Sequence, residues 1–277
     1  MEDWHKGLKP ETLEVFEPIS KMDSIKGLYL CGGTAVYLQL QHRQSEDLDF
    51  EFLATRRNQI PEFNISEIVE ELNLFFPENR REILGSDHVQ FYVGKNVKLS
   101  FFRPKDPVPM LNNGFVHNNL RAPSLQDLLG MKLFTISVRF AFRDYYDIYS
   151  LLRAGCSLTD GILYACKFSQ HKVKSKQLYT TLLTPHLFVT DEKSGLLAPK
   201  YSISSEEIAE FIKTKIYYET LPFHIFLSPS AIGSCGTERE DTGRCHSCRI
   251  FGERFNKGLF LARKSAISGK HEHVAVC

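Results

Sequence analysis

Apolar residues at every third position predict that the chain begins with a helix over residues 10–25, in which Pro18 is a candidate interruption. A short apolar run at residues 28–31 then meets paired glycines, and a helical pattern follows at residues 34–40. This order predicts a strand, a tight turn and a helix. The positions that define the first pattern are Leu13, Phe16, Ile19 and Met22.

Acidic and apolar residues alternate over residues 47–52 with the period of two that is typical of a strand. Residues 67–76 have a helical pattern, with Ser66 as the predicted N-cap and Pro77 as the stop. Residues 89–102 predict a β-hairpin around a turn that contains a glycine. One face of the strand predicted at residues 47–52 carries the carboxylates of Asp47, Asp49 and Glu51.

The pattern becomes helical from Ser124, which with Asp127 supplies a cap and an acidic first turn for an apolar face that reaches residue 140. Further helices are predicted at residues 143–152, 158–168 and 205–218, the last capped by Ser204 or Ser205. We therefore predict an α/β (α+β) core with a small mixed sheet at residues 1–122, a mainly helical region at residues 123–221, and a Cys-, Gly- and Arg-rich extension at residues 222–277.

The composition is that of a folded globular protein, with 277 residues, 43% of them hydrophobic and 24% charged. The formal net charge is only +1, so a nucleic-acid partner would have to meet a local patch. The N-terminus lacks the apolar stretch of a signal peptide, and no segment has the length of a membrane span. Four of the seven cysteines have no close cysteine neighbour, which predicts a reducing, cytoplasmic setting: Cys31, Cys156, Cys166 and Cys277.

Two short motifs could carry chemistry. Paired glycines before a helix, at Gly32 and Gly33, allow an anion to approach the unpaired N–H groups of the helix, although an isolated pair is more often an ordinary turn. The carboxylates of Asp47 and Asp49 project from one strand face and could hold a cation such as Mg²⁺, and the alternative is a solvated strand face. Because Asp is disfavoured in strands, the metal site is the better interpretation.

A glycine turn, a helix and a strand with Asp-x-Asp follow one another in nucleotidyltransferases of the polymerase-β type. Residues 30–35 (LCGGTA) and 42–50 (HRQSEDLDF) resemble the first motif of the AbiEii/AbiGii family of nucleotidyltransferase toxins. Residues 131–133 (MKL), Arg139 and residues 143–149 (RDYYDIY) are similar to the later helical motif of that family. The resemblance spans residues 28–152 and implies a nucleotidyltransferase core.

The resemblance also implies roles for single residues. Gly32, Gly33 and Thr34 would cradle phosphate, and Asp47 and Asp49 would bind Mg²⁺ or Mn²⁺. Lys132 and Arg139 would contact the triphosphate, and Asp144 or Asp147 would take part in the active site, against the alternative of a structural Arg–Asp network. The residues themselves support Lys132, because a lysine among apolar helix positions is costly to bury without an anion, although a lysine at the helix edge can also reach solvent.

One position departs from the polymerase-β pattern. A third carboxylate is common on a neighbouring strand, but here Ser100 occupies the expected place. We expect one well-defined cation site, with a second completed by substrate phosphates. Lys98 faces the same way as Ser100 and could add a positive charge for the phosphates.

The C-terminal extension contains a second constellation, outside the resemblance. Cys235, Cys245 and Cys248, with His246 and later histidines, could hold Zn²⁺, and free thiols are the alternative interpretation.

The sequence therefore predicts a metal-dependent enzyme that transfers a nucleotide from a nucleoside triphosphate to RNA, with transfer RNA as a candidate acceptor. By resemblance it would be the toxin of a toxin–antitoxin system, with a cognate antitoxin as partner. The alternative is a weakened member that only binds nucleotide or an antitoxin, which the loss of a carboxylate at Ser100 would favour.

Overall fold

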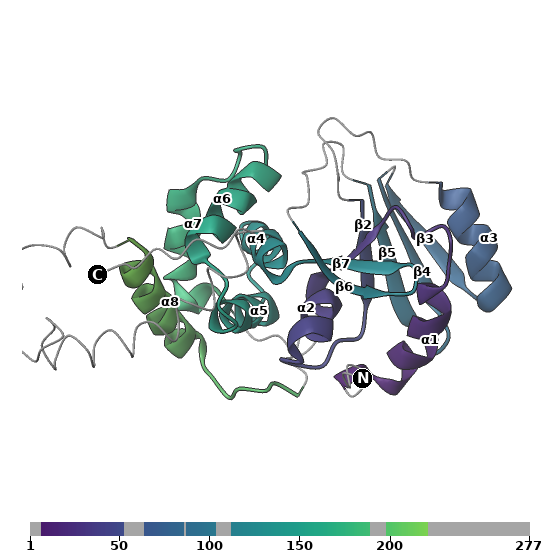
Figure 1. Ribbon diagram of the computed structural model, residues 1–277, viewed down its shortest axis with the longest axis horizontal. Helices are drawn as coiled ribbons and strands as arrows, with labels where there is room; N and C mark the ends of the chain where they lie inside the picture. The colour runs from purple at the N-terminus through teal and green to yellow at the C-terminus, as the bar shows by residue number, and fades with distance from the viewer. Residues whose placement is uncertain (1–6, 53–63, 86, 104–111, 189–197, 221–277) are drawn as a thin grey trace, which may run out of the picture. The chain divides into compact units, whose positions relative to one another are not determined.

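The computed structural model describes residues 7–52, 64–85, 87–103, 112–188 and 198–220 (Figure 1). Its helices are α1 (Pro10–Ser20), α2 (Gly32–Leu40), α3 (Ile65–Phe75), α4 (Leu125–Thr135), α5 (Phe142–Arg153), α6 (Leu158–Phe168), α7 (Ser175–Leu182), the 3-10 helix η2 (Pro185–Leu187) and α8 (Ser205–Thr220). Its strands are β1 (Tyr29–Cys31), β2 (Leu48–Glu51), β3 (Arg80–Gly85), β4 (His88–Val93), β5 (Val97–Phe102), β6 (Asn113–His117) and β7 (Leu120–Pro123). The cysteine-rich extension lies outside the described residues.

Five strands form one mixed sheet in the order β1-β2-β5-β4-β3, and β6 and β7 form a separate hairpin. Strand β2 runs parallel to β5, whereas β1–β2, β5–β4 and β4–β3 are antiparallel pairs. This mixed sheet, followed by helices, confirms the predicted α/β core and helical region. Strand β3 and the β6–β7 hairpin were not predicted.

The two faces of the sheet differ in polarity because side chains alternate along each strand. One face is buried and apolar, and its rings pack across strands, with the Phe50 and Phe101 centroids 5.2 Å apart. The other face is polar and half-buried, and it carries Asp49 of β2, Lys98 of β5 and Gln90 of β4. The buried face is made of Leu48, Phe50, Val89, Phe91, Leu99 and Phe101.

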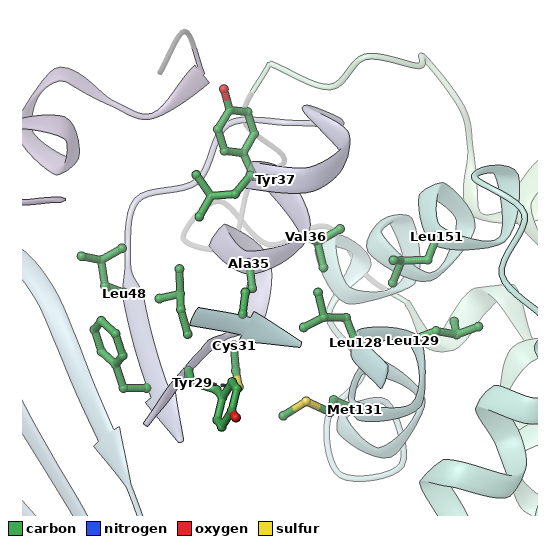
Figure 2. Close-up of a cluster of buried hydrophobic side chains, with 14 of the residues drawn as sticks. Tyr29, Cys31, Ala35, Val36, Tyr37, Leu48, Leu128, Leu129, Met131 and Leu151 are labelled. Carbon is green, nitrogen blue, oxygen red and sulfur yellow. Dashed lines mark hydrogen bonds between the residues drawn. The ribbon is translucent and has the colours of Figure 1, made fainter. Parts of the chain in front are cut away.

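Strand β1 passes into α2 without a loop between them, and the first helical residue is Gly32. Its φ of 69° lies in the left-handed region, and a Cβ there would lie 2.8 Å from Oδ2 of Asp49. Only glycine satisfies both conditions without strain. Figure 2 shows how α2 is held in place: its Val36 lies among apolar side chains of α4 and α5, including Leu128 and Leu151.

Several helix ends differ from the predicted ones. Helix α1 continues through Pro18 and ends two residues later at Ser20, so the proline, which lacks an N–H donor, lies in its last turn. The N-cap of α3 is Asn64 rather than Ser66, because the Asn64 side chain accepts a hydrogen bond of 3.1 Å from the Ser66 N–H. The Ser124 cap of α4 is confirmed, although the helix ends at Thr135.

The predicted core and helical regions share one hydrophobic cluster, which extends from Leu8 to Ile212. The described residues up to Glu219 belong to one compact unit. Among the described helices, none combines the length and the hydropathy that a membrane crossing requires.

Candidate functional site

An open pocket lies where Gly32 and Gly33 at the start of α2 (the glycine turn), the loop before β2 and helices α4 and α5 meet. Gly32, Gly33, Asp47, Asp49, Lys132, Arg139 and Asp144 were predicted as site residues, and all of them line it. The remaining lining residues are Arg43, Gln44, Ser45, Glu46 and Arg143. The structure therefore brings together segments separated by about a hundred positions in the chain.

Asp47 and Asp49 are half-buried on the sheet side of the pocket. Asp49 lies on β2 between Cys31 of β1 and Ser100 of β5, its partners in register. Asp47 directly precedes β2, and its Oδ2 forms an ion pair of 2.6 Å with Nζ of Lys98. Lys98 thus neutralises one of the two candidate metal-binding carboxylates.

The glycine turn approaches the pocket closely, but Thr34 does not line it. Thr34 is buried, and its hydroxyl contacts the backbone oxygen of Asp47 and lies 2.7 Å from Oγ of Ser45. These bonds hold the loop before β2 against α2. Thr34 therefore positions Asp47, whereas Gly32 and Gly33 face the pocket.

Asp147 is completely buried and is not among the lining residues. Arg43 donates to it from Nε over 2.6 Å and from Nη2 over 2.9 Å, and Nε2 of His42 lies 2.6 Å from Oδ1. Burial would raise the pKa of Asp147, but Arg43, Lys132 and His42 outweigh it and hold the pKa well below its usual range. Asp147 is therefore an anion that ties the loop of Arg43 to α4 and α5.

Lys132 is 5% exposed and lies between two carboxylates. Its Nζ is 2.8 Å from Oδ1 of Asp144 and 2.6 Å from Oδ2 of Asp147. Burial alone would lower the pKa of Lys132, but these two carboxylates raise it, so the ammonium stays charged. Arg139 is half-exposed and binds the other side of Asp144, with Nε 2.8 Å from Oδ2.

Two arginines in the pocket received no role from the sequence. Arg43 is buried beside the glycine turn, and Arg143 is half-buried, with no acidic partner in the part of the chain that the structure describes. Both lie inside the motifs that carry the family resemblance, Arg43 in residues 42–50 and Arg143 directly before the predicted site residue Asp144. With Lys132 and Arg139 they are the four cations of the pocket lining, which we call the positive wall, and Asp144 pairs with two of them, Lys132 and Arg139.

Asp47 and Asp49 are the candidate ligands of a metal ion in the pocket. The described residues contain no cluster of three or more His, Cys, Asp or Glu side chains that could hold a metal. The carboxylates of Asp47 and Asp49 fit a cation such as Mg²⁺, which keeps waters and takes its other oxygens from phosphates. Glu51 is the nearest further carboxylate on β2, and burial, together with the charge of Asp49, raises its pKa to about 7.

The buried His42 gives a pH-dependent prediction. Burial lowers the pKa of His42 below its ordinary 6.5, because it outweighs the opposite effect of the Asp147 charge. Below pH 6.5 the unfolded chain therefore binds more protons at this residue than the folded chain does. The contribution of His42 to the free energy of unfolding should therefore fall as pH decreases from 6.5, by at most about 1.4 kcal/mol per pH unit, while Glu51, with its raised pKa, contributes in the opposite direction. Denaturant unfolding between pH 6.5 and 5 should therefore show that wild type loses stability relative to His42→Gln as pH falls, and identical pH slopes in the two proteins would show that His42 makes no such contribution.

The chain is similar to several known proteins. A family model described as "Nucleotidyl transferase AbiEii toxin, Type IV TA system" matches residues 15–221. An uncharacterized protein of Aquifex aeolicus, aq_aa25, is 28% identical over 148 residues, which are 53% of this chain and 68% of the relative.

Solved structures with a similar arrangement include JHP933 from Helicobacter pylori and the nucleotidyltransferase toxin MenT4 (Rv2826c) from Mycobacterium tuberculosis. JHP933 is 16% identical, with a TM-score of 0.48 over 80% of this chain and 98% of that one. MenT4 is 13% identical, with a TM-score of 0.48 over 92% of this chain and 95% of that one.

Proposed function

From the membership of this chain in the AbiEii nucleotidyl transferase toxin family, we propose that it transfers a nucleotide from a nucleoside triphosphate to an acceptor hydroxyl in a reaction that needs Mg²⁺ or Mn²⁺. RNA is the proposed acceptor. The proposed setting is the cytoplasm, as the toxin of a toxin–antitoxin system with a cognate antitoxin.

The observation that carries this proposal is the division of charge in the pocket. Two half-buried carboxylates, Asp47 and Asp49, come from the sheet side, and three cations, Lys132, Arg139 and Arg143, come from the helical side. Asp144 lies among these cations and pairs with Lys132 and Arg139, whereas Arg143 has no acidic partner among the described residues. A nucleoside triphosphate has four negative charges and binds metal through its phosphate oxygens, so it complements both sides. A pocket for a neutral ligand would have no need of so many buried ions.

Asp47 and Asp49 would hold the cation, which would neutralise charge on the triphosphate and on the entering and leaving oxygens. The glycine turn would receive phosphate at the N-terminus of α2, where Cys31 provides no side-chain cap for the first N–H groups. Lys132 would bind phosphate while Asp144 and Asp147 fix its position. With Ser100 beside Asp49, a second cation would depend on phosphate oxygens for its remaining ligands.

The proposal can be tested by incubating the protein with each labelled triphosphate, Mg²⁺ and total RNA. Radioactivity or fluorescence should move into an RNA band with one or a few of the four nucleotides. A chelator should abolish the transfer. Absence of label in RNA and in protein, with intact triphosphate binding, would contradict a transferase.

Lys132→Ala should weaken triphosphate binding and also slow transfer, because the charge of Lys132 would meet phosphate both before and during the reaction. We expect at least about a tenfold loss of affinity, measured by calorimetry. The exposed Lys95, which pairs with Glu14 on the surface, supplies the control variant Lys95→Ala. If Lys132→Ala binds triphosphate as well as the control does, Lys132 supports the fold rather than the ligand.

The ion pair of Lys98 with Asp47 is the observation that favours the binding-only alternative, because a neutralised carboxylate is a poorer metal ligand. The variant Lys98→Gln distinguishes an enzyme that transfers nucleotide from a protein that only binds it. In an enzyme the loss of this pair should change the Mg²⁺ concentration that transfer requires. In a protein that only binds nucleotide, no transfer would be measurable in either form.

A further inference from the structure

Four exposed lysines lie close together on the surface that joins α6 to α7. We call residues 167–176 the lysine turn, and its lysines are Lys167, Lys172, Lys174 and Lys176. No Asp or Glu occurs in the sequence from Gly161 to Phe188. Because the whole chain has a net charge of only +1, the lysine turn is a local concentration of positive charge.

The lysines of the turn differ from exposed lysines elsewhere in their partners. Lys21, Lys26, Lys95 and Lys213 each form an ion pair with a nearby Asp or Glu. In the parts of the chain described by the structure, no acidic side chain pairs with a lysine of the turn, and Nζ of Lys174 donates to the backbone oxygen of His171 over 2.6 Å. The charge of the turn is therefore available to a partner.

The N-terminus of α7 adds to this positive field. Lys174 is its N-cap residue, Lys176 lies in its first turn, and neither an acidic residue nor a side-chain cap is present there. Lysine is unfavourable at this end of a helix, because the helix dipole is itself positive there. An anion bound at the turn would satisfy the lysines and the unpaired N–H groups together.

The turn has a defined conformation. Gln170 and His171 have φ angles of 53° and 62°, in the left-handed region that non-glycine residues rarely adopt. The His171 N–H donates to the oxygen of Cys166 over 2.6 Å, and the Val173 N–H donates to Oγ of Ser169 over 3.0 Å. Val173 is also buried, so the backbone that carries the lysines is fixed in place.

The lysine turn lies at the same end of the α4–α6 pair as the pocket cations. These helices run in the same direction, because Gln126 bonds Ser157 at their beginnings and the rings of Phe134 and Phe168 are 5.1 Å apart at their ends. Lys132 lies in the last turns of α4. One polyanion could therefore contact the turn and extend to the pocket.

We propose that the lysine turn binds the phosphate backbone of the RNA acceptor while the reacting end of that RNA enters the pocket. The identification of the RNA as an acceptor depends on the proposed function, whereas RNA binding by the turn can be tested separately. Lysine ammonium groups serve as point charges for phosphates. A protein partner would require apolar or aromatic anchors, but every exposed side chain in the turn is polar or basic.

The test compares two variants with equal loss of charge. K167Q/K172Q/K174Q/K176Q removes the turn's charges, and K21Q/K26Q/K95Q/K213Q removes four paired lysines elsewhere, so both take the net charge from +1 to −3. Affinity for a fluorescent transfer RNA is measured between 50 and 200 mM salt without nucleotide, on the full chain. At the lower salt the turn variant should bind about tenfold or more weakly, and its salt slope should decrease by roughly 0.7–0.9 per lost contact.

The control variant should retain the RNA affinity and salt slope of the wild type, and triphosphate affinity should be unchanged in both variants. Equal RNA binding by the turn variant and the control overturns the inference. It is also overturned if the turn variant keeps its RNA affinity and loses only its affinity for an acidic protein. If the quadruple variant does not fold, K167Q/K172Q and K174Q/K176Q are measured in its place. A wild type that binds RNA through the turn but transfers no nucleotide supports this inference and contradicts the proposed transfer.

Discussion

Asp49→Asn should lower the rate of nucleotide transfer by about two or more orders of magnitude, because charge stabilisation by a metal in the transition state is worth several kcal/mol. The substitution keeps the size of the side chain and removes its charge. Asp49 is half-buried on the pocket side of β2 and forms no ion pair with the residues that the structure describes. The free energy of unfolding should therefore remain close to that of the wild type.

Asp160→Asn is the matched control, because Asp160 is exposed in the first turn of α6 and does not line the pocket. It should transfer nucleotide at the wild-type rate. The assay is a single-turnover measurement with saturating triphosphate and RNA. If Asp49→Asn and Asp160→Asn react equally fast, Asp49 does not hold a catalytic metal.

The fold could be predicted where the sequence pattern is strong. The alternation along β2, β4 and β5 gave their positions correctly, because each strand has one buried apolar face. Strand β3 contains Arg80, Arg81 and Glu82 at the edge of the sheet, where both faces are open to solvent, so it has no alternation to detect. Helix α7 is too short, at 8 residues, for a periodic pattern to stand out.

The members of the candidate site could be predicted largely through the family resemblance, but their division of labour could not. Asp144 and Asp147 are equivalent in the sequence, three positions apart on one helix. The structure separates them, because Arg43 comes from a loop about a hundred residues away and encloses Asp147 alone. Long-range pairing of this kind leaves no signal in local periodicity.

The contacts of Thr34 and Lys98 with Asp47 also join residues that are far apart in the sequence. Each was predicted to contact phosphate, which stays a prediction, and each contacts Asp47 in the structure: Thr34 contacts its backbone oxygen and Lys98 its carboxylate. A role for Lys98 at phosphate remains a prediction that depends on whether the Asp47 ion pair persists when a cation binds. The loop of Asp47 is thus held by α2 on one side and by β5 on the other.

Asp147→Asn should reduce the free energy of unfolding by about 3–5 kcal/mol, because it leaves buried cations without their counterion. Arg43 donates two hydrogen bonds to Asp147 and Lys132 forms an ion pair with it, and all three side chains are largely excluded from solvent. Asn offers one oxygen where the carboxylate offers two, and carries no charge. Denaturant unfolding at pH 7 measures the difference.

Asp144→Asn provides the comparison, because Asp144 is as well buried but lines the pocket and pairs with Arg139, whose side chain is 53% exposed. Water can solvate Arg139 once the carboxylate is gone, so Asp144→Asn should lose less stability than Asp147→Asn. If Asp147→Asn keeps wild-type stability but loses transfer activity, Asp147 acts on the bound substrate or metal. The expected result, an unfolding midpoint lowered far more by Asp147→Asn than by Asp144→Asn, would show that Asp147 is the anion that holds the pocket's positive wall together.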